Sequence, residues 1–175
     1  PKIFVEPEKR QIGMVFQDIA LFPHLSVKEN IQFGIRSLSK NLREKRSNEL
    51  LDLVGMSEFK KKYPHEISGG QQQRIALARA MAPKPSLLLM DEPLSSLDEE
   101  LREQLAREIR LILKQEKISA ILVTHDQNEA FAMGDHICVM HKGRVQQNDS
   151  AYNLYHHPLN RFVAEFIGEG TLLPG

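Results

Sequence analysis

The chain has 175 residues, of which 41% are hydrophobic and 26% are charged, a composition typical of a globular domain that buries a core. Basic and acidic residues both number 23, so the charge balance gives no indication of a nucleic-acid or anionic-membrane partner. The apolar runs are too short to cross a bilayer, and the first ten residues are not a signal peptide. The single cysteine, Cys138, excludes an internal disulfide and indicates a reducing compartment, and its apolar neighbours predict a buried position.

The predicted elements alternate between short apolar strands and longer helices. A first strand is followed by residues 27–81, a helical insertion in which no strand pattern occurs. A later helix is predicted from Glu99 to Gln115, with Leu101, Leu105, Ile109 and Ile112 on one face and a capping box formed by Ser96 and Glu99. The alternation predicts an α/β fold with buried, parallel strands. The predicted strands are QIGMVF (11–16), SLLLM (86–90), SAILVT (119–124) and HICVMH (136–141).

Polar side chains follow three of these strands. Asp91 and Glu92 come after SLLLM, Gln17 follows the first strand, and His125 follows SAILVT. Open α/β sheets bind ligands at the carboxyl ends of their strands, so these side chains are candidates for phosphate chemistry. The aspartate can hold Mg²⁺ through water while the glutamate polarises an attacking water; the glutamine amide can ligate the metal, and the histidine can reach a terminal phosphate. The alternatives are solvated turn carboxylates ahead of Pro93 and a structural histidine.

The stretch ISGGQQQRIALARA (67–80) places a serine and two glycines ahead of a predicted helix. Bare backbone N–H groups and the positive end of the helix would then face outward, where an anion can bind. Gly69 and Gly70 would let a phosphate approach the backbone closely. The alternative is a flexible turn in which Ser68 is an ordinary N-cap.

Taken together, these residues resemble the nucleotide-binding subunits of ABC transporters. ISGGQQQR is similar to the family signature, LLLMDEP to its Walker B strand with the catalytic glutamate, and SSLD to its D-loop. His125 is similar to the switch histidine and Gln17 to the Q-loop, and the five motifs keep the family's order and spacing over nearly the whole chain. The resemblance implies a P-loop NTPase-like core with a parallel sheet and a helical subdomain, and ATP and Mg²⁺ as cofactors.

The resemblance also implies the roles of individual residues in ATP hydrolysis. Asp91 would bind Mg²⁺, and Glu92 would activate the attacking water. His125 would contact the γ-phosphate, and Gln17 would serve both the metal and the water. An intact family member hydrolyses ATP with these groups.

A second set of residues is implied to act across a head-to-tail dimer of ATPase subunits. Ser68, Gly69, Gly70 and Gln71 would close over ATP that is held by the other subunit. Asp98, in the D-loop, would lie at the dimer seam.

One family motif is missing from the printed sequence. No G-x-x-x-x-G-K-[ST] occurs in it, and in the family this phosphate-binding loop precedes the Q-loop. We therefore expect an N-terminally truncated core, either an internal piece of a longer subunit or a degraded copy. The implied domains are the end of the catalytic core with the Q-loop (1–26), the helical subdomain with the signature (27–81), the catalytic core with Walker B, D-loop and H-loop (82–149), and a C-terminal helical tail leading to a regulatory domain (150–175).

Two longer segments, 7–34 and 154–168, resemble importers of ferric ion, polyamines, sugars or oxyanions, and FIGEGTLLPG (166–175) resembles the ferric-ion branch. The implied partners are a second ATPase subunit, a membrane permease and, indirectly, an extracytoplasmic solute-binding protein, at the cytoplasmic face of the inner membrane. We expect ALFPHLSV (20–27) to dock the permease, although Phe22 and Leu25 can equally be core residues. Two other functions stay open, a soluble ABC ATPase of translation or DNA repair and a non-catalytic fragment acting through dimer or permease contacts.

Overall fold

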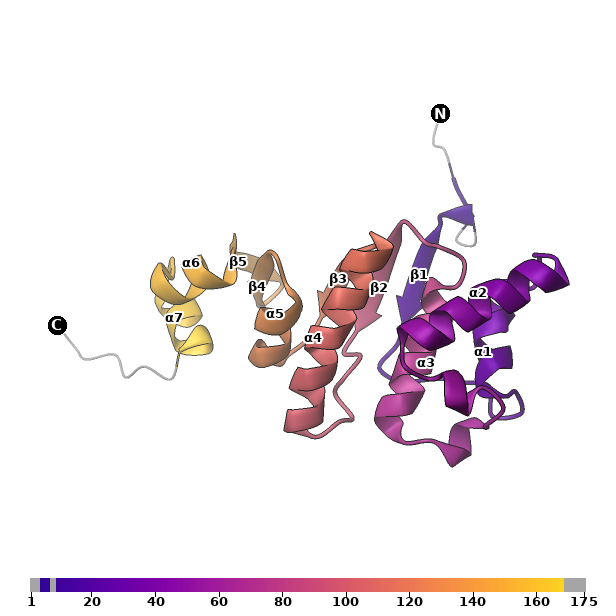
Figure 1. Ribbon diagram of the computed structural model, residues 1–175. Helices are drawn as coiled ribbons and strands as arrows, with labels where there is room; N and C mark the ends of the chain where they lie inside the picture. The colour runs from indigo at the N-terminus through magenta and orange to yellow at the C-terminus, as the bar shows by residue number, and fades with distance from the viewer. Residues whose placement is uncertain (1–3, 7–8, 169–175) are drawn as a thin grey trace. The chain divides into compact units, whose positions relative to one another are not determined.

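The computed structural model describes residues 4–6 and 9–168 (Figure 1). They fall into two compact units, which divide between Thr124 and His125. The first unit contains β1 (Ile12–Val15), α1 (Val27–Phe33), α2 (Lys40–Leu53), η2 (Ser57–Phe59), η3 (Pro64–Glu66), α3 (Gly69–Met81), β2 (Leu87–Asp91), α4 (Glu99–Glu116) and β3 (Ser119–Val123). The second contains α5 (Gln127–Met133), β4 (Ile137–His141), β5 (Arg144–Asp149), α6 (Ala151–His156) and α7 (Arg161–Ile167).

The first unit is built on a parallel sheet with the strand order β1-β2-β3. This confirms the α/β class and the three strands predicted there. One face of the sheet is buried, with Val15, Leu88 and Met90 at most 3% exposed. The prediction that the strands are buried is therefore correct for this face only, because among the described residues the other face leaves large apolar side chains exposed. These are Ile12, Met14, Ile121 and Val123.

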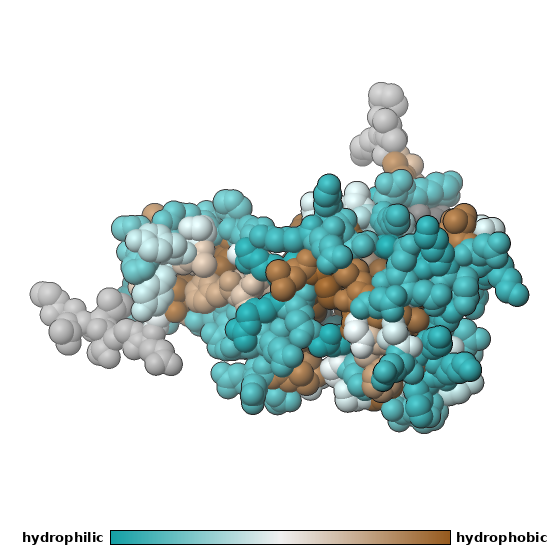
Figure 2. Space-filling view, viewed as in Figure 1, coloured by the Kyte–Doolittle hydropathy of each residue, from teal (hydrophilic) through white to brown (hydrophobic). Residues whose placement is uncertain are grey.

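Residues 27–81 are helical throughout their regular structure, as predicted, and α1, α2 and α3 contact one another. Val27, Ile31, Leu50 and Ile75 are fully buried between them. On the face shown in Figure 2, these helices present mainly hydrophilic surface, and hydrophobic surface gathers over the neighbouring β2, β3 and α4. The helical region is therefore a compact layer with its apolar stripes turned inward.

Helix α4 begins one residue after its capping side chain. Asp98 is the N-cap, and its carboxylate accepts a hydrogen bond of 3.0 Å from the Leu101 N–H. The predicted capping box of Ser96 and Glu99 is therefore wrong, because Ser96 lies two residues outside the cap. The predicted apolar face is confirmed for Leu105, Ile109 and Ile112, which are buried.

The second unit is organised by an antiparallel hairpin of β4 and β5. The prediction that residues 136–141 join the parallel sheet is wrong: these residues turn back through Lys142 and Gly143, both at positive φ, into a strand that the sequence analysis did not predict. Val139 faces the core of this unit, so its neighbour Cys138 points the other way and is exposed, which corrects its predicted burial. In the part of the chain that is described, no helix combines the length and the apolar character needed to cross a membrane.

Candidate functional site

The ends of β1 and β2 bring three predicted site residues to one edge of the sheet. Val15 pairs with Met90, so Gln17 and Glu92 each lie two residues beyond a paired position. Asp91 is the last residue of β2 and is itself exposed. The structure therefore places an amide and two carboxylates at the edge where parallel α/β sheets bind their ligands.

The backbone at Glu92 turns sharply away from the sheet. Its φ of 43° lies in the left-handed region, which a residue with a side chain rarely adopts. Its N–H donates to the Val123 carbonyl oxygen at 2.8 Å, and its own carbonyl oxygen accepts from the Ser95 N–H at 3.3 Å and from the Ser95 hydroxyl at 3.0 Å. These bonds fix an unfavourable conformation, and such strain clusters at functional sites.

His125 belongs to the other unit. It lies two residues beyond the end of β3, its side chain is exposed, and it is followed by Asp126, the N-cap of α5. Its role beside Glu92 therefore stays a prediction.

The predicted glycine pair lies inside the first turn of α3 rather than ahead of it. Ser68 is the N-cap, and a capping box joins it to Gln71: the Ser68 N–H donates to the Gln71 amide oxygen at 2.9 Å, and the Gln71 N–H donates to the Ser68 hydroxyl at 3.3 Å. Within the described residues, the N–H groups of Gly69 and Gly70 have no acceptor. They are the free donors of a helix N-terminus.

The two glycines have different surroundings. A Cβ added to Gly69 would lie 3.8 Å from its nearest neighbour, a methyl carbon of Leu97, whereas one added to Gly70 would lie 3.2 Å from a methyl carbon of Leu101. Gly70 therefore lets α3 approach α4 closely, and exposed Gly69 leaves the backbone open. The contacts also place the α3 turn beside the start of α4, where Asp98 is the exposed N-cap.

The residues present fit Mg²⁺ held together with a phosphate. Asp91 and Gln17 offer two hard oxygen donors at one sheet edge. No group of three His, Cys, Asp or Glu side chains that would hold a metal occurs among the described residues. Mg²⁺ is usually bound by one or two carboxylates, with water and phosphate oxygens as its other ligands, so a site of this kind needs no closed protein cage.

Sequence reasoning missed two residues that shape the loop between β1 and α1. Asn30 is fully buried, and its amide bonds the backbone of Phe22, Leu25 and Ser26. Arg79 of α3 donates to the carbonyl oxygen of Ala20 at 2.7 Å. Burial lowers the pKa of the Arg79 guanidinium, which nevertheless stays charged in proteins. Asn30 lies on the buried side of α1 together with Val27 and Ile31. A polar residue among the apolar positions of a helix is the sequence pattern that could have identified it.

The aromatic side chain of this loop is half buried. The ring of Phe22 lies 4.2 Å from that of Phe33, and the Arg36 guanidinium lies 4.0 Å from the centre of the Phe33 ring. Pro23 and His24 are exposed, whereas Phe22 and Leu25 are partly buried. The loop therefore combines a packed interior with an exposed tip.

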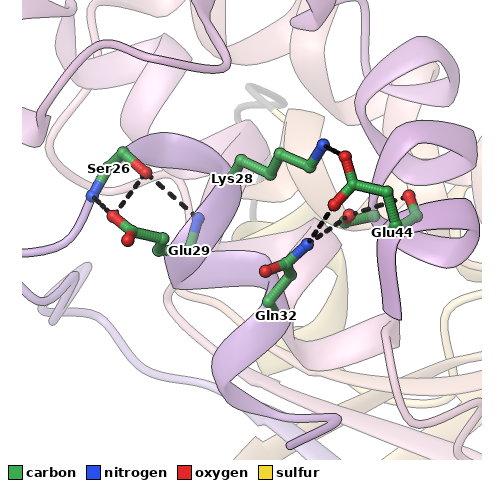
Figure 3. A network of polar contacts seen from close by, with 6 residues as sticks. Ser26, Lys28, Glu29, Gln32 and Glu44 are labelled. Atoms are coloured by element: carbon green, nitrogen blue, oxygen red, sulfur yellow. Dashed lines mark hydrogen bonds and ion pairs between the residues drawn. The ribbon is translucent and has the colours of Figure 1, made fainter. Parts of the chain in front are cut away.

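Figure 3 shows a polar network between α1 and α2 that contains none of the residues predicted for ATP hydrolysis or for the dimer seam, although Ser26 belongs to the predicted docking stretch 20–27. Ser26 and Glu29 form the capping box of α1, and the Ser26 hydroxyl lowers the pKa of that glutamate. Lys28 and Gln32 reach Glu44 on α2, and the hydrogen bond from Lys28 lowers the pKa of Glu44. An open hollow of about 540 Å³ lies over the network. The ion pair between Lys28 and Glu44 joins the two helices, so the network stabilises the packing of α1 against α2.

Comparison with known proteins supplies the family. Residues 4–95, more than half of the chain, match the family described as ABC transporter. The chain is 52% identical over 170 residues to the spermidine/putrescine import ATP-binding protein PotA of Ruegeria pomeroyi, a match that covers 96% of this chain and 46% of the relative. It is 49% identical over 170 residues to the Fe(3+) ions import ATP-binding protein FbpC 2 of Rhizobium meliloti, covering 96% of this chain and 43% of the relative.

A third relative carries a different solute in its name. The chain is 46% identical over 169 residues to the sulfate/thiosulfate import ATP-binding protein CysA 2 of Chromobacterium violaceum, covering 96% of this chain and 46% of the relative. The chain thus spans about half the length of the curated relatives it matches. The family match confirms the resemblance stated from the motifs, and the chain belongs to the ABC transporter family.

Proposed function

We propose that this chain is part of the ATP-hydrolysing subunit that drives an importer. The observation that carries the proposal is the layout of the first unit, which contains both a carboxylate pair at a sheet edge and a helix N-terminus with free N–H groups beside Asp98. The import ATP-binding names of the relatives support the direction of transport. These names give no support to a soluble ATPase of translation or DNA repair, or to a non-catalytic fragment.

Each residue at the sheet edge has a task in phosphoryl transfer. Glu92 accepts a proton from the attacking water, and Gln17 orients that water. Asp91, with Gln17, holds Mg²⁺, which neutralises charge on the phosphate oxygens when it is bound. His125 contacts the terminal phosphate. The backbone at Glu92 is strained and is held by hydrogen bonds to Val123 and Ser95, as is common at functional sites.

The turn of Ser68, Gly69, Gly70 and Gln71 acts on a second ATPase subunit. It offers free N–H groups and a helix dipole but no lysine, so it suits the closing of a site around a nucleotide already bound elsewhere. In a head-to-tail dimer, each turn covers ATP on the partner, and Asp98 lies at the seam. Residues 27–81 act as the helical subdomain that carries this turn.

The permease docks at ALFPHLSV (20–27). Pro23 and His24 are exposed at the tip of this loop, and Phe22 packs against Phe33 beneath them. The subunit then works at the cytoplasmic face of the inner membrane, and an extracytoplasmic solute-binding protein delivers the solute. We propose ferric ion or another small solute. The names of similar relatives include a polyamine, Fe(3+) and sulfate, so overall identity separates these solutes little. Most of the ferric-type tail, residues 169–175, lies outside the described residues.

Replacement of Glu92 by glutamine tests the chemistry. In the protein expressed from the complete open reading frame that contains this chain, we expect E92Q to bind ATP normally and to hydrolyse it more slowly by roughly 10² to 10⁴, the usual effect of losing a positioned general base. Steady-state hydrolysis and the binding of a fluorescent ATP analogue measure the two quantities. Hydrolysis by E92Q within about tenfold of the wild-type rate would contradict the role of Glu92.

A further inference from the structure

The C-terminal part of α3 is packed closely against the elements on either side of the β1–α1 loop. A Cβ added to Gly13 of β1 would lie 2.8 Å from the Ala80 carbonyl oxygen, and one added to Gly34, at the end of α1, would lie 3.3 Å from that of Arg79. Two glycines thus let β1 and α1 approach the backbone of α3. Because of this close packing, the C-terminal end of α3 cannot shift unless β1 and α1 shift with it.

Arg79 extends this contact to the loop itself. One guanidinium nitrogen donates to the Ala20 carbonyl oxygen at 2.7 Å, and the other lies 3.4 Å from that of Ile19. The guanidinium carbon is also 5.4 Å from the centre of the Phe22 ring. Ala20 has a φ of 44°, an unfavourable conformation. A side chain nearly 60 residues away in sequence therefore holds the start of the loop.

Asn30 holds the rest of the loop. Its amide oxygen accepts from the Phe22 N–H at 2.8 Å. Its amide nitrogen lies 3.0–3.1 Å from the carbonyl oxygens of Phe22, Leu25 and Ser26. The loop has no regular secondary structure, yet it is fixed at both halves, so a force on its tip is passed to α1 and α3 rather than absorbed locally.

Helix α3 joins two places to which the proposed function gives separate roles. Its first turn contains Gly69 and Gly70, and Arg79 lies ten residues later, about 15 Å along the axis. We propose that Arg79 is a positioning residue that ties the permease-docking loop to α3, so that docking displaces the nucleotide-facing turn at the other end of the helix. The inference rests on the proposed function and adds the residue through which the two sites are coupled.

The geometry requires an arginine. A planar guanidinium presents separate N–H groups to two carbonyl oxygens and a flat face to an aromatic ring, whereas a lysine ammonium is a single point of charge. R79K keeps the charge and can bond one carbonyl. R79Q removes the charge and the fork.

The test measures coupling in the complete open reading frame product, assembled with its permease in proteoliposomes. The quantity is the rate of ATP hydrolysis with solute-loaded binding protein divided by the rate without it. We expect R79Q to lower this ratio by about tenfold and R79K to recover part of it, a change within the usual range of coupling between sites. The control is R107Q, which removes a mainly exposed arginine of α4 whose ion pair to Glu103 lies within the same helix.

The outcomes separate the two proposals. A wild-type protein without any stimulation would overturn the proposed function and the inference with it. Wild-type stimulation that R79Q retains in full, or that R107Q loses equally, would overturn the inference alone.

If R79Q does not fold, hydrogen exchange of R79K decides. We then expect faster exchange at the amides of residues 19–25 and unchanged exchange in β2. Equal exchange in the loop of R79K and wild type would overturn the inference.

Discussion

Glu92 has a side chain suited to catalysis on a backbone suited to glycine. Its φ of 43° costs stability because Cβ crowds the backbone, yet the bonds to Val123 and Ser95 hold it there. A residue chosen for stability alone would be glycine at this position. The strain is therefore consistent with selection for the carboxylate.

This conflict predicts an order of stability between two variants. E92G and E92A both lack the carboxylate, but only alanine keeps the Cβ that crowds a left-handed backbone. We expect E92G to unfold at a higher urea concentration than E92A, with a free energy of unfolding about 1 kcal/mol larger. The control variants R107G and R107A, inside α4, should show the reverse order of stability, with R107A the more stable, because glycine destabilises a helix interior. Equal stability of E92A and E92G would show that the turn at residue 92 relaxes without cost.

At the scale of the element, a substitution at the start of α3 can have opposite effects on the stability of the helix and on the binding of a phosphate. G69D adds a carboxylate where an added Cβ has room, and negative charge in a first turn favours the helix. The same charge repels a phosphate that approaches the free N–H groups. We expect G69D to fold and to lose ATP-dependent dimerisation, measured by light scattering of the open reading frame product.

Two controls make this prediction specific. G69N has nearly the shape of G69D without its charge, so it should dimerise better. G70A places a Cβ 3.2 Å from a methyl carbon of Leu101, so it tests the contact between α3 and α4 instead. If G69D dimerises as well as G69N, the proposal that a phosphate binds near Gly69 is contradicted.

The elements that the sequence predicted well are those with strong local signals. Periodicity located the three parallel strands, the helical region 27–81 and the buried face of α4. The cap of α4 was misplaced because Ser96 and Asp98 are both good caps two residues apart, and only the observed bond to Leu101 identifies Asp98. The hairpin was missed because the apolar run 136–141 predicts a strand but does not indicate whether its partner is parallel or antiparallel.

The site was predictable only in part for the same reason. Gln17, Asp91 and Glu92 follow apolar strands, a local pattern, and the parallel sheet brings them to one edge. Arg79 and Asn30 could not be found in this way, because they bind loop carbonyl oxygens that carry no sequence signature. Contacts to the backbone depend on the fold rather than on residue type.

At the scale of the whole molecule, one face of the first unit's sheet is exposed among the residues that the structure describes. Parallel sheets are normally buried on both sides, yet Ile12, Met14, Ile121 and Val123 are more than 40% exposed. Within the described residues, β3 is also an edge strand of this sheet. An apolar face and an open edge favour association with other chains, so we expect the 175-residue polypeptide to be poorly soluble by itself.

The last prediction concerns ATP binding by these 175 residues alone. Most phosphate contacts in P-loop NTPases come from a Gly-rich loop, its lysine and its hydroxyl on Mg²⁺, and the printed sequence contains no such loop. The turn at Gly69 and Gly70 offers only the free N–H groups of one helix end, which suit a nucleotide held mainly by another subunit. We therefore expect weak or no ATP binding and no measurable hydrolysis.

Isothermal titration measures the binding of Mg-ATP to the 175-residue chain and to a matched polypeptide. The matched polypeptide is the same chain preceded by a strand and a G-x-x-x-x-G-K-[ST] loop. The extended chain should bind ATP with a dissociation constant in the micromolar range, about 8 kcal/mol of binding free energy, and the 175-residue chain should not. Comparable binding by both polypeptides would contradict the prediction. It would mean that the described residues hold the triphosphate themselves, and the edge formed by Gln17, Asp91 and Glu92 would then be the first place to look for the contacts.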